Sequence, residues 1–134
     1  NFLKNLTAEH DFCHGFKESI AEPGGRERLK DAIKNNPPVV HPVIWTHPIT
    51  KRKAIFVFRL FTTKINELSK SESDALLEFL YSYSITPEFT CRFSWTPNSI
   101  AIWDNRCTLH KPINDYFPEH RLLERITVDG DEPF

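Results

Sequence analysis

The stretch from Asn98 to Phe134 contains the pattern that most limits how this chain can fold: two apolar runs on either side of a polar turn region. The runs are Ser99–Trp103 and Leu122–Val128. His110 follows the first run, and Arg121 stands at the start of the second. Two antiparallel strands with this spacing would bring an imidazole and a guanidinium to the mouth of one pocket. An imidazole ligates divalent transition metals and a guanidinium grips a carboxylate, so the pattern indicates an enzyme that uses an organic acid beside a metal.

On spacing alone, both side chains also have ordinary structural explanations. A histidine near a strand end is more often simply hydrogen-bonded, and an arginine on a strand is more often solvated or ion-paired. Other features of the chain therefore have to decide between these interpretations.

Size and composition indicate a globular fold and exclude some kinds of partner. The 134 residues correspond to one domain or part of one, and 40% hydrophobic with 26% charged residues is typical of a globular chain. A net charge of −1 gives no electrostatic reason to expect nucleic acid or an anionic membrane as partner. No apolar run is long enough to span a bilayer. We therefore expect neither a nucleic-acid nor a membrane role.

The cysteines and the missing methionine bear on compartment and completeness. Cys13, Cys91 and Cys107 form no CxxC pair, which argues against a zinc knuckle or a disulfide framework and favours reduced thiols in a cytoplasmic protein. The chain contains no methionine and begins in a helix-like pattern, so we expect it to be a fragment, a processed chain or the ordered part of a longer polypeptide.

Hydrophobic periodicity predicts a mixed set of elements. Residues 1–12 are expected to be the end of an amphipathic helix, and further helices are expected over 26–34 and over 72–83, the last capped by Ser69 or Ser71. Strands are expected over 54–60 and 89–95, and the Pro-punctuated run 39–49 predicts an edge strand or an irregular connection. His41 and His47 precede prolines, and each is expected to cap a turn or pack against a neighbour. Antiparallel strands with inserted helices indicate a β-sandwich or jelly roll.

The motif WDNRCTLH, residues 103–110, followed by His120-Arg121 and Arg125-Ile126-Thr127, resembles the C-terminal part of the TauD/TfdA family. These are taurine-type, Fe(II)- and 2-oxoglutarate-dependent dioxygenases. Further segments resemble the family in the same order, so that the resemblance covers nearly the whole chain: AEHDF (8–12), NNPPVVHPVIWTHPIT (35–50), FTTKI (61–65), SESDALLEFL (71–80), PEFTCRFSWTPNSIAIWDNR (87–106) and GDEPF (130–134).

The resemblance implies a mainly β fold with inserted helices, a double-stranded β-helix or jelly roll that is incomplete in this chain. Residues 1–134 would be the C-terminal portion of one such domain. The family holds iron with two histidines and one carboxylate, which leaves positions for 2-oxoglutarate and O₂. By the match, His110 would be the second histidine ligand and thus the catalytic metal residue. Arg121 would bind the distal carboxylate of 2-oxoglutarate.

Three further residues match substrate-binding positions of the family. Arg125 would hold an anionic group of the substrate or the inner carboxylate of the co-substrate, and Phe61 and Trp103 would line the pocket. A structural ion pair with Glu124 or Asp129 is the alternative for Arg125, and a plain core aromatic is the alternative for Phe61. The implied reaction hydroxylates a small organic anion, most simply a sulfonate such as taurine, with release of sulfite and an aldehyde, while 2-oxoglutarate becomes succinate and CO₂. Family members often self-associate, so a homo-oligomer is expected as well.

The chain also departs from the family pattern. It contains no His-x-Asp or His-x-Glu motif, so it has one of the three iron ligands, and we expect these 134 residues alone to bind iron weakly or not at all. Trp45 stands where an Arg is common, Phe58 where an Asn is common, and Lys111-Pro112 follows the ligand in place of an aromatic and a small residue. Alkyl sulfates and aryloxyacetates therefore stay open as substrates. The rival interpretation is a truncated or degenerate dioxygenase-fold domain that binds or supports without catalysis.

Overall fold

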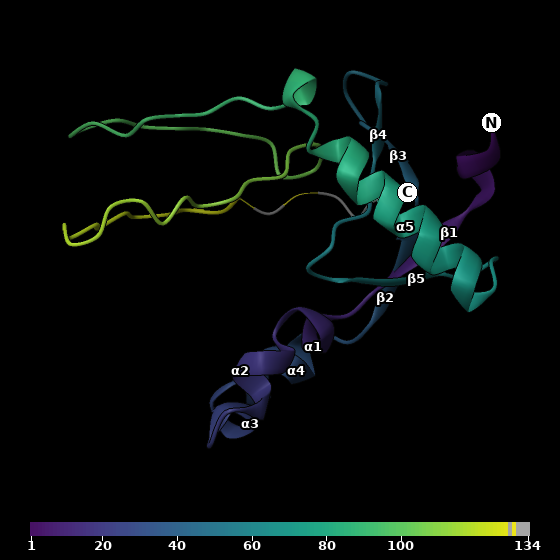
Figure 1. Cartoon of the computed structure of the whole chain (residues 1–134), viewed down its shortest axis with the longest axis horizontal. Coiled ribbons are helices and arrows are strands. Elements are labelled where there is room, and N and C mark those ends of the chain that lie inside the picture. The colour runs from purple at the N-terminus through teal and green to yellow at the C-terminus, as the bar shows by residue number, and fades with distance from the viewer. Residues whose placement is uncertain (129, 131–134) are drawn as a thin grey trace.

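The computed structural model describes residues 1–128 and 130 and contains two small antiparallel sheets with helices around them (Figure 1). The strands are β1 (Thr7–His10), β2 (Val39–Pro42), β3 (Ile44–Thr46), β4 (Lys53–Ile55) and β5 (Thr62–Ile65). The α-helices are α1 (Phe12–Gly15), α2 (Lys17–Ala21), α3 (Gly25–Arg28), α4 (Lys30–Asn35) and α5 (Lys70–Ser84). Two 3-10 helices cover Phe2–Asn5 and Pro87–Phe89. None of the described helices combines the length and apolarity needed to cross a bilayer.

The first sheet has the strand order β2-β1-β5, and the second consists of β3 and β4. In β1 the side chains alternate: Ala8 and His10 are buried, while Thr7 and Glu9 are half-exposed. β2 is an edge strand that ends at Pro42, because proline has no backbone N–H to offer a further strand. The edge position predicted from the prolines of this region is therefore confirmed.

Helix α5 covers the first sheet, and the small apolar core lies between them. Ser69 begins the helix: its backbone N–H donates to the Glu72 carboxylate at 2.9 Å, one half of a capping box. Ser73 is buried on the inner face, where its hydroxyl accepts the N–H of Ile65 at 2.8 Å and fastens α5 to β5. The buried apolar side chains of the core are Leu6, Ala8, Val43, Val57, Ile65, Leu77 and Leu80.

Two predicted elements take another form near the N-terminus and in the middle of the chain. The helical pattern over 1–12 is wrong beyond Asn5, because Thr7–His10 pairs with two strands as the centre of a sheet. The strand predicted over 54–60 ends at Ile55. Beyond it, the Phe58 carbonyl accepts the N–H of Thr62 at 3.0 Å, and this turn takes the backbone out of the extended ladder.

Residues 90–128 run out from the sheets and back twice, in two extended excursions (Figure 1). The strands predicted over 89–95, 99–103 and 122–128 are not formed. The backbone hydrogen bonds described beyond residue 90 close only local turns, at Thr96–Ser99, Asp104–Cys107 and Tyr116–Glu119. An extended segment becomes a strand only when a neighbour takes up its N–H and C=O groups, and these segments have no such neighbour among the described residues. The described residues accordingly form no closed barrel.

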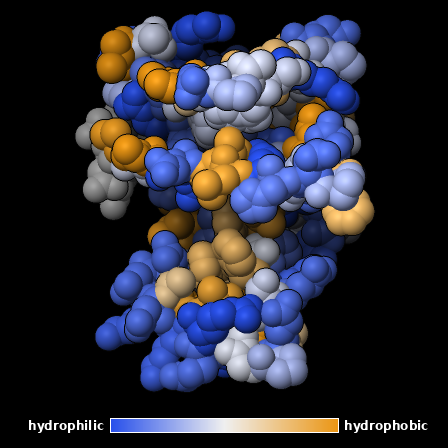
Figure 2. Space-filling view, turned by 90° about the vertical axis from the view of Figure 1, so that its left-hand side faces the viewer, coloured by the Kyte–Doolittle hydropathy of each residue, from blue (hydrophilic) through white to orange (hydrophobic). Residues whose placement is uncertain are grey.

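The excursions leave many large apolar side chains in contact with solvent. Ile102 and Ile126 are more than 90% exposed, and Ile100 and Val128 more than 80%. On the side of the molecule shown in Figure 2, apolar (orange) residues reach the surface between polar ones. Surface of this kind normally packs against another part of a protein.

Candidate functional site

The structure brings two of the predicted site residues, His110 and Trp103, together. Their ring centroids lie 5.1 Å apart at an interplanar angle of 50°. His110 is exposed and forms no hydrogen bond with a described residue, so a ring nitrogen is available to a metal ion. The two residues flank the Asp104–Cys107 turn, one residue before it and three after it.

Arg121 and Arg125 lie on the returning limb of the second excursion, beyond the turn at Tyr116–Glu119. The Arg121 guanidinium carbon is 5.5 Å from the centroid of the Tyr116 ring, and the side chain is half-buried. Arg121 and Arg125 make no ion pair with a described residue, which leaves both guanidiniums available for an anion. Glu124 does not pair with Arg125, and the alternative partner, Asp129, lies outside the described residues. No described contact joins either arginine to His110.

Phe61 lies apart from these residues, in an aromatic cluster beside the start of β5. Its ring is 5.9 Å from that of Phe16 and 5.8 Å from that of Phe58, centroid to centroid, and it packs directly on Gly15. No described contact joins Phe61 to Trp103 or His110. The environment is that of a packing aromatic, the alternative to a pocket wall.

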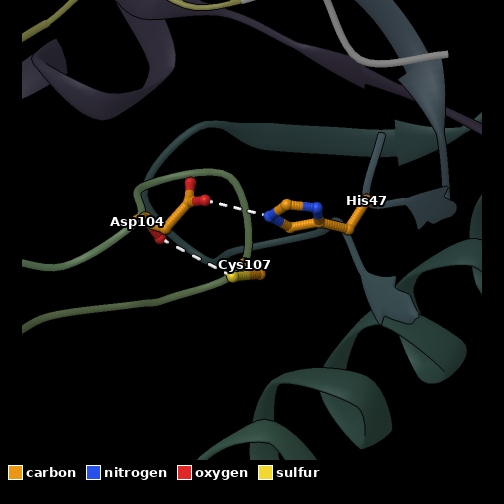
Figure 3. A group of neighbouring side chains, drawn as sticks. All are labelled: His47, Asp104 and Cys107. Carbon is orange, nitrogen blue, oxygen red and sulfur yellow. Dashed lines mark hydrogen bonds and ion pairs between the residues drawn. The ribbon is translucent and has the colours of Figure 1, made fainter. Parts of the chain in front are cut away.

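A compact polar network fixes the Asp104–Cys107 turn against the second sheet (Figure 3). The His47 ring, 9% exposed, lies just after β3, and its Nε2 is 3.0 Å from Oδ2 of Asp104. His47 Nδ1 accepts the N–H groups of Ile49 and Thr50, each at 3.2 Å. The expectation that His47 caps a turn is therefore confirmed, whereas its bond to Asp104, 57 positions away, has no signal in the sequence.

His47, Asp104 and Cys107 place three ligand-type atoms within 4.8 Å of one another, yet their bonding does not suit a metal. Because Nδ1 accepts two backbone N–H groups, the imidazole proton sits on Nε2, the nitrogen that would have to ligate. The Asp104 carboxylate is already occupied by the Arg106 side chain at 2.8 Å and the Arg106 backbone N–H at 2.9 Å. These bonds to Arg106, with a smaller contribution from His47, hold the pKa of Asp104 well below its usual range. The cluster is an ion-pair network, and His110 is the better candidate for a ligand.

His10 is a buried polar residue that sequence reasoning did not single out. It is 6% exposed, and its ring packs against those of His41, Phe56 and Phe58. Burial, with the adjacent His41 as a smaller cause, lowers the pKa of His10 from 6.5 to about 4. The Thr62 hydroxyl accepts the Phe58 N–H and lies 3.1 Å from His10 Nδ1, with which it shares a hydrogen bond, whereas His10 Nε2 has no partner among the described residues. The neutral imidazole is thus built into the sheet.

Comparison with known proteins agrees with the family resemblance of the segment that contains His110. Residues 1–127 match the family model described as taurine catabolism dioxygenase TauD, TfdA family. The chain belongs to the TauD/TfdA family. The resemblance inferred from the WDNRCTLH motif is therefore confirmed over nearly all of the chain.

Two curated relatives match almost the entire chain. An alpha-ketoglutarate-dependent sulfonate dioxygenase of Saccharomyces cerevisiae is 37% identical over 99% of this chain and 31% of its own length. An alkylsulfatase of Acinetobacter baylyi is 34% identical over 97% of this chain and 42% of its own length. The chain thus spans less than half the length of these curated relatives.

Solved structures that resemble the chain include taurine dioxygenases. A taurine dioxygenase from Burkholderia xenovorans is 28% identical, with a TM-score of 0.52 over 71% of this chain and 27% of that protein. The fold described above is therefore that of part of a TauD-type dioxygenase.

Proposed function

We propose that this chain forms the C-terminal part of an Fe(II)- and 2-oxoglutarate-dependent dioxygenase that hydroxylates a small organic anion, most simply a sulfonate such as taurine. The observation that carries the proposal is the family match over residues 1–127, which includes the WDNRCTLH motif that ends in His110. The names of the relatives, a sulfonate dioxygenase and an alkylsulfatase, support an anion that bears a sulfur oxyacid group.

In this proposal His110 provides one imidazole ligand to the iron. Its exposure and its lack of a hydrogen bond to any described residue support that role, since a ligating nitrogen must be free of a proton and of other partners. Trp103, in ring contact with His110, would shield one side of the metal and form a wall of the substrate pocket. When bound, iron with 2-oxoglutarate and O₂ supplies the oxidising power for hydroxylation.

Arg121 would bind the distal carboxylate of 2-oxoglutarate through two parallel hydrogen bonds. The Tyr116 ring below its guanidinium favours a fixed orientation of that fork. Arg125, exposed on the same limb, would neutralise the anionic group of the substrate or the inner carboxylate of the co-substrate. Phe61 is the weakest member of the proposed pocket, because its described contacts are with Gly15 and other aromatic rings.

We further propose that residues 1–134 are the C-terminal portion of one jelly-roll domain. The partial coverage of the relatives supports this, as do the exposed apolar side chains of the two excursions, such as Ile102 and Ile126. Strands from the remainder of such a domain would pair with the excursions and cover these side chains. The three unpaired cysteines are compatible with the reducing conditions of the cytoplasm, where we propose the enzyme works, and self-association is proposed on family resemblance.

Succinate formation by the full-length protein tests the function. The assay contains Fe(II), 2-oxoglutarate and O₂ and runs over a panel of sulfonates, alkyl sulfates and aryloxyacetates. We expect substrate-dependent turnover that is lost in His110→Ala. The matched control is His120→Ala, since His120 is an exposed histidine of the same excursion. Turnover with one member of the panel would also identify the substrate class.

Binding of iron and 2-oxoglutarate separates the two interpretations of the fold. A dioxygenase binds both, and its affinity for 2-oxoglutarate falls in Arg121→Ala. A domain that binds neither, in the full-length protein, would refute the proposal in favour of a degenerate dioxygenase fold that acts without catalysis.

A further inference from the structure

Within the part of the chain that the structure describes, the turn that precedes His110 is held in place by side chains and not by pairing with a strand. The backbone hydrogen bonds described for residues 91–128 are all within local turns, so no pairing with another described strand fixes the position or direction of this segment. The Asp104–Cys107 turn nevertheless lies against the second sheet, where its Asp104 side chain meets His47 (Figure 3). This hydrogen bond joins positions 57 residues apart.

His47 is well built for holding such a turn. Its Nδ1 is fixed by two backbone N–H groups of the turn that follows β3, which sets both the ring orientation and the tautomer. The Nε2–H therefore points at the Asp104 carboxylate and has one role, to donate to it at 3.0 Å. The His47 ring also packs on Trp45, which is 1% exposed, with 5.4 Å between ring centroids.

Arg106 holds the Asp104 carboxylate in its ionised form, so that it serves as a hydrogen-bond acceptor for His47. Arg106 binds both oxygens of the Asp104 carboxylate, through Nε at 2.9 Å and through its terminal nitrogen at 2.8 Å. The guanidinium carbon of Arg106 lies 6.0 Å from the centroid of the Trp45 ring. Trp45, His47, Asp104 and Arg106 thus form one connected unit between β3 and the turn, which we call the His47 clamp.

The position of the clamp relates it to the proposed iron site. Trp103 precedes the clamped turn by one residue and His110 follows it by three, and the two rings touch at 5.1 Å. A turn that is free to rotate would carry both rings with it. Ligand geometry must be held closely for tight metal binding, and loss of supporting groups typically costs about 10–100-fold in affinity.

We propose that His47 is a positioning residue: through its hydrogen bond to Asp104 it fixes the turn from which His110 reaches the iron. The inference rests on the proposed function, because it takes His110 as an iron ligand. In this inference His47 binds neither the metal nor the substrate.

Two substitutions separate the two nitrogens of His47. In His47→Gln the amide N–H reaches roughly where Nε2 lies, so the bond to Asp104 can be kept while the acceptor for Ile49 and Thr50 is lost. In His47→Asn the amide oxygen replaces Nδ1 as acceptor, but the side chain is too short to reach Asp104. If His47 served only to cap the turn after β3, His47→Gln would be the damaging substitution. If His47 holds the Asp104 turn, as proposed, His47→Asn is the damaging one.

The readouts are the Fe(II) dissociation constant, measured anaerobically against a chelator in the full-length protein, and amide hydrogen exchange over residues 105–110. We expect His47→Asn to weaken Fe(II) binding about 10-fold or more and to speed exchange in this segment, while His47→Gln stays within about 3-fold of wild type. Ser73→Ala is the control for general loss of stability, because it removes a buried hydrogen bond on α5 and should leave Fe(II) affinity unchanged.

The outcomes distinguish this inference from the proposed function. If His110→Ala abolishes Fe(II) binding while His47→Asn binds like wild type, or while Gln and Asn are equally impaired, the positioning role is overturned and the dioxygenase proposal stands. If His110→Ala leaves Fe(II) binding intact, the proposed ligand is wrong and the positioning role falls with it.

Discussion

Acidification should destabilise this fold through His10. The ring is 6% exposed, and its surroundings lower its pKa to about 4, against an ordinary value of 6.5 in the unfolded chain. Protonating His10 in the folded state therefore costs about 3 kcal/mol more than in the unfolded state. Because the folded pKa is the lower one, the neutral ring favours folding. This contribution is complete above pH 6.5 and is lost as the pH falls from 6.5 through 4, with about 2 kcal/mol gone by pH 5.

Urea unfolding of the full-length protein between pH 7.5 and pH 5 measures the effect. The free energy of unfolding of the wild type should fall by about 2 kcal/mol more than that of His10→Phe over this range, because phenylalanine cannot titrate. Its ring still fills the space between the neighbouring aromatic rings. His14→Gln serves as the control, since His14 is exposed, and its pH dependence should match that of the wild type. Direct titration of ¹³C-labelled histidine by NMR supplies an independent value. Equal pH dependence in wild type and His10→Phe, or a His10 resonance that titrates near pH 6.5, would refute the reasoning.

Two further predictions concern packing. Leu80→Ala should lower the free energy of unfolding by about 2–5 kcal/mol, because Leu80 is 2% exposed and lies in the core. Phe79→Ala is the control: this adjacent side chain is 62% exposed, and its loss should cost under about 1 kcal/mol. Urea unfolding measures both variants, and similar losses would contradict the placement of α5. Gly15→Ala should lower the free energy of unfolding by about 1–3 kcal/mol, because the new methyl group would clash with the Phe61 ring and lie 2.8 Å from the Leu60 carbonyl oxygen. An unchanged thermal midpoint would contradict this prediction and show that the Phe61 ring moves aside without cost.

The elements that could be predicted are those whose cause lies within a few residues. The helix over Lys70–Ser84 follows from an apolar stripe and a serine cap, and the structure selects Ser69 because Glu72 stands three residues later and completes the capping box. The edge strand that ends at Pro42 and the turn capped by His47 follow in the same way from local chemistry.

The elements that were missed depend on partners distant in the sequence. Strand β1 buries a small residue and a histidine, Ala8 and His10, so its inward face does not read as apolar. Burial of His10 relies on the hydroxyl of Thr62, and the turn before His110 relies on His47, and neither pairing leaves a local pattern. The strands predicted for the apolar runs at 99–103 and 122–128 are not formed. Their composition is typical of strands, but pairing requires a neighbouring strand that the described residues do not provide.

The order of strands in the first sheet has a consequence for how the protein emerges from the ribosome. Of the three strands of this sheet β1 is synthesised first, yet it is the central strand, and its partner on one side is β5: Thr63 hydrogen-bonds Glu9 across 54 positions. At a translation rate of about 5–20 residues per second, β1 waits roughly 3–10 s for that partner. The short helices between them, from Phe12 to Asn35, can form at once because their contacts are local. During this interval the edge of β1 that will pair with β5 stays unpaired, even after β2 has paired with the opposite edge, and an unpaired strand edge can pair with another chain.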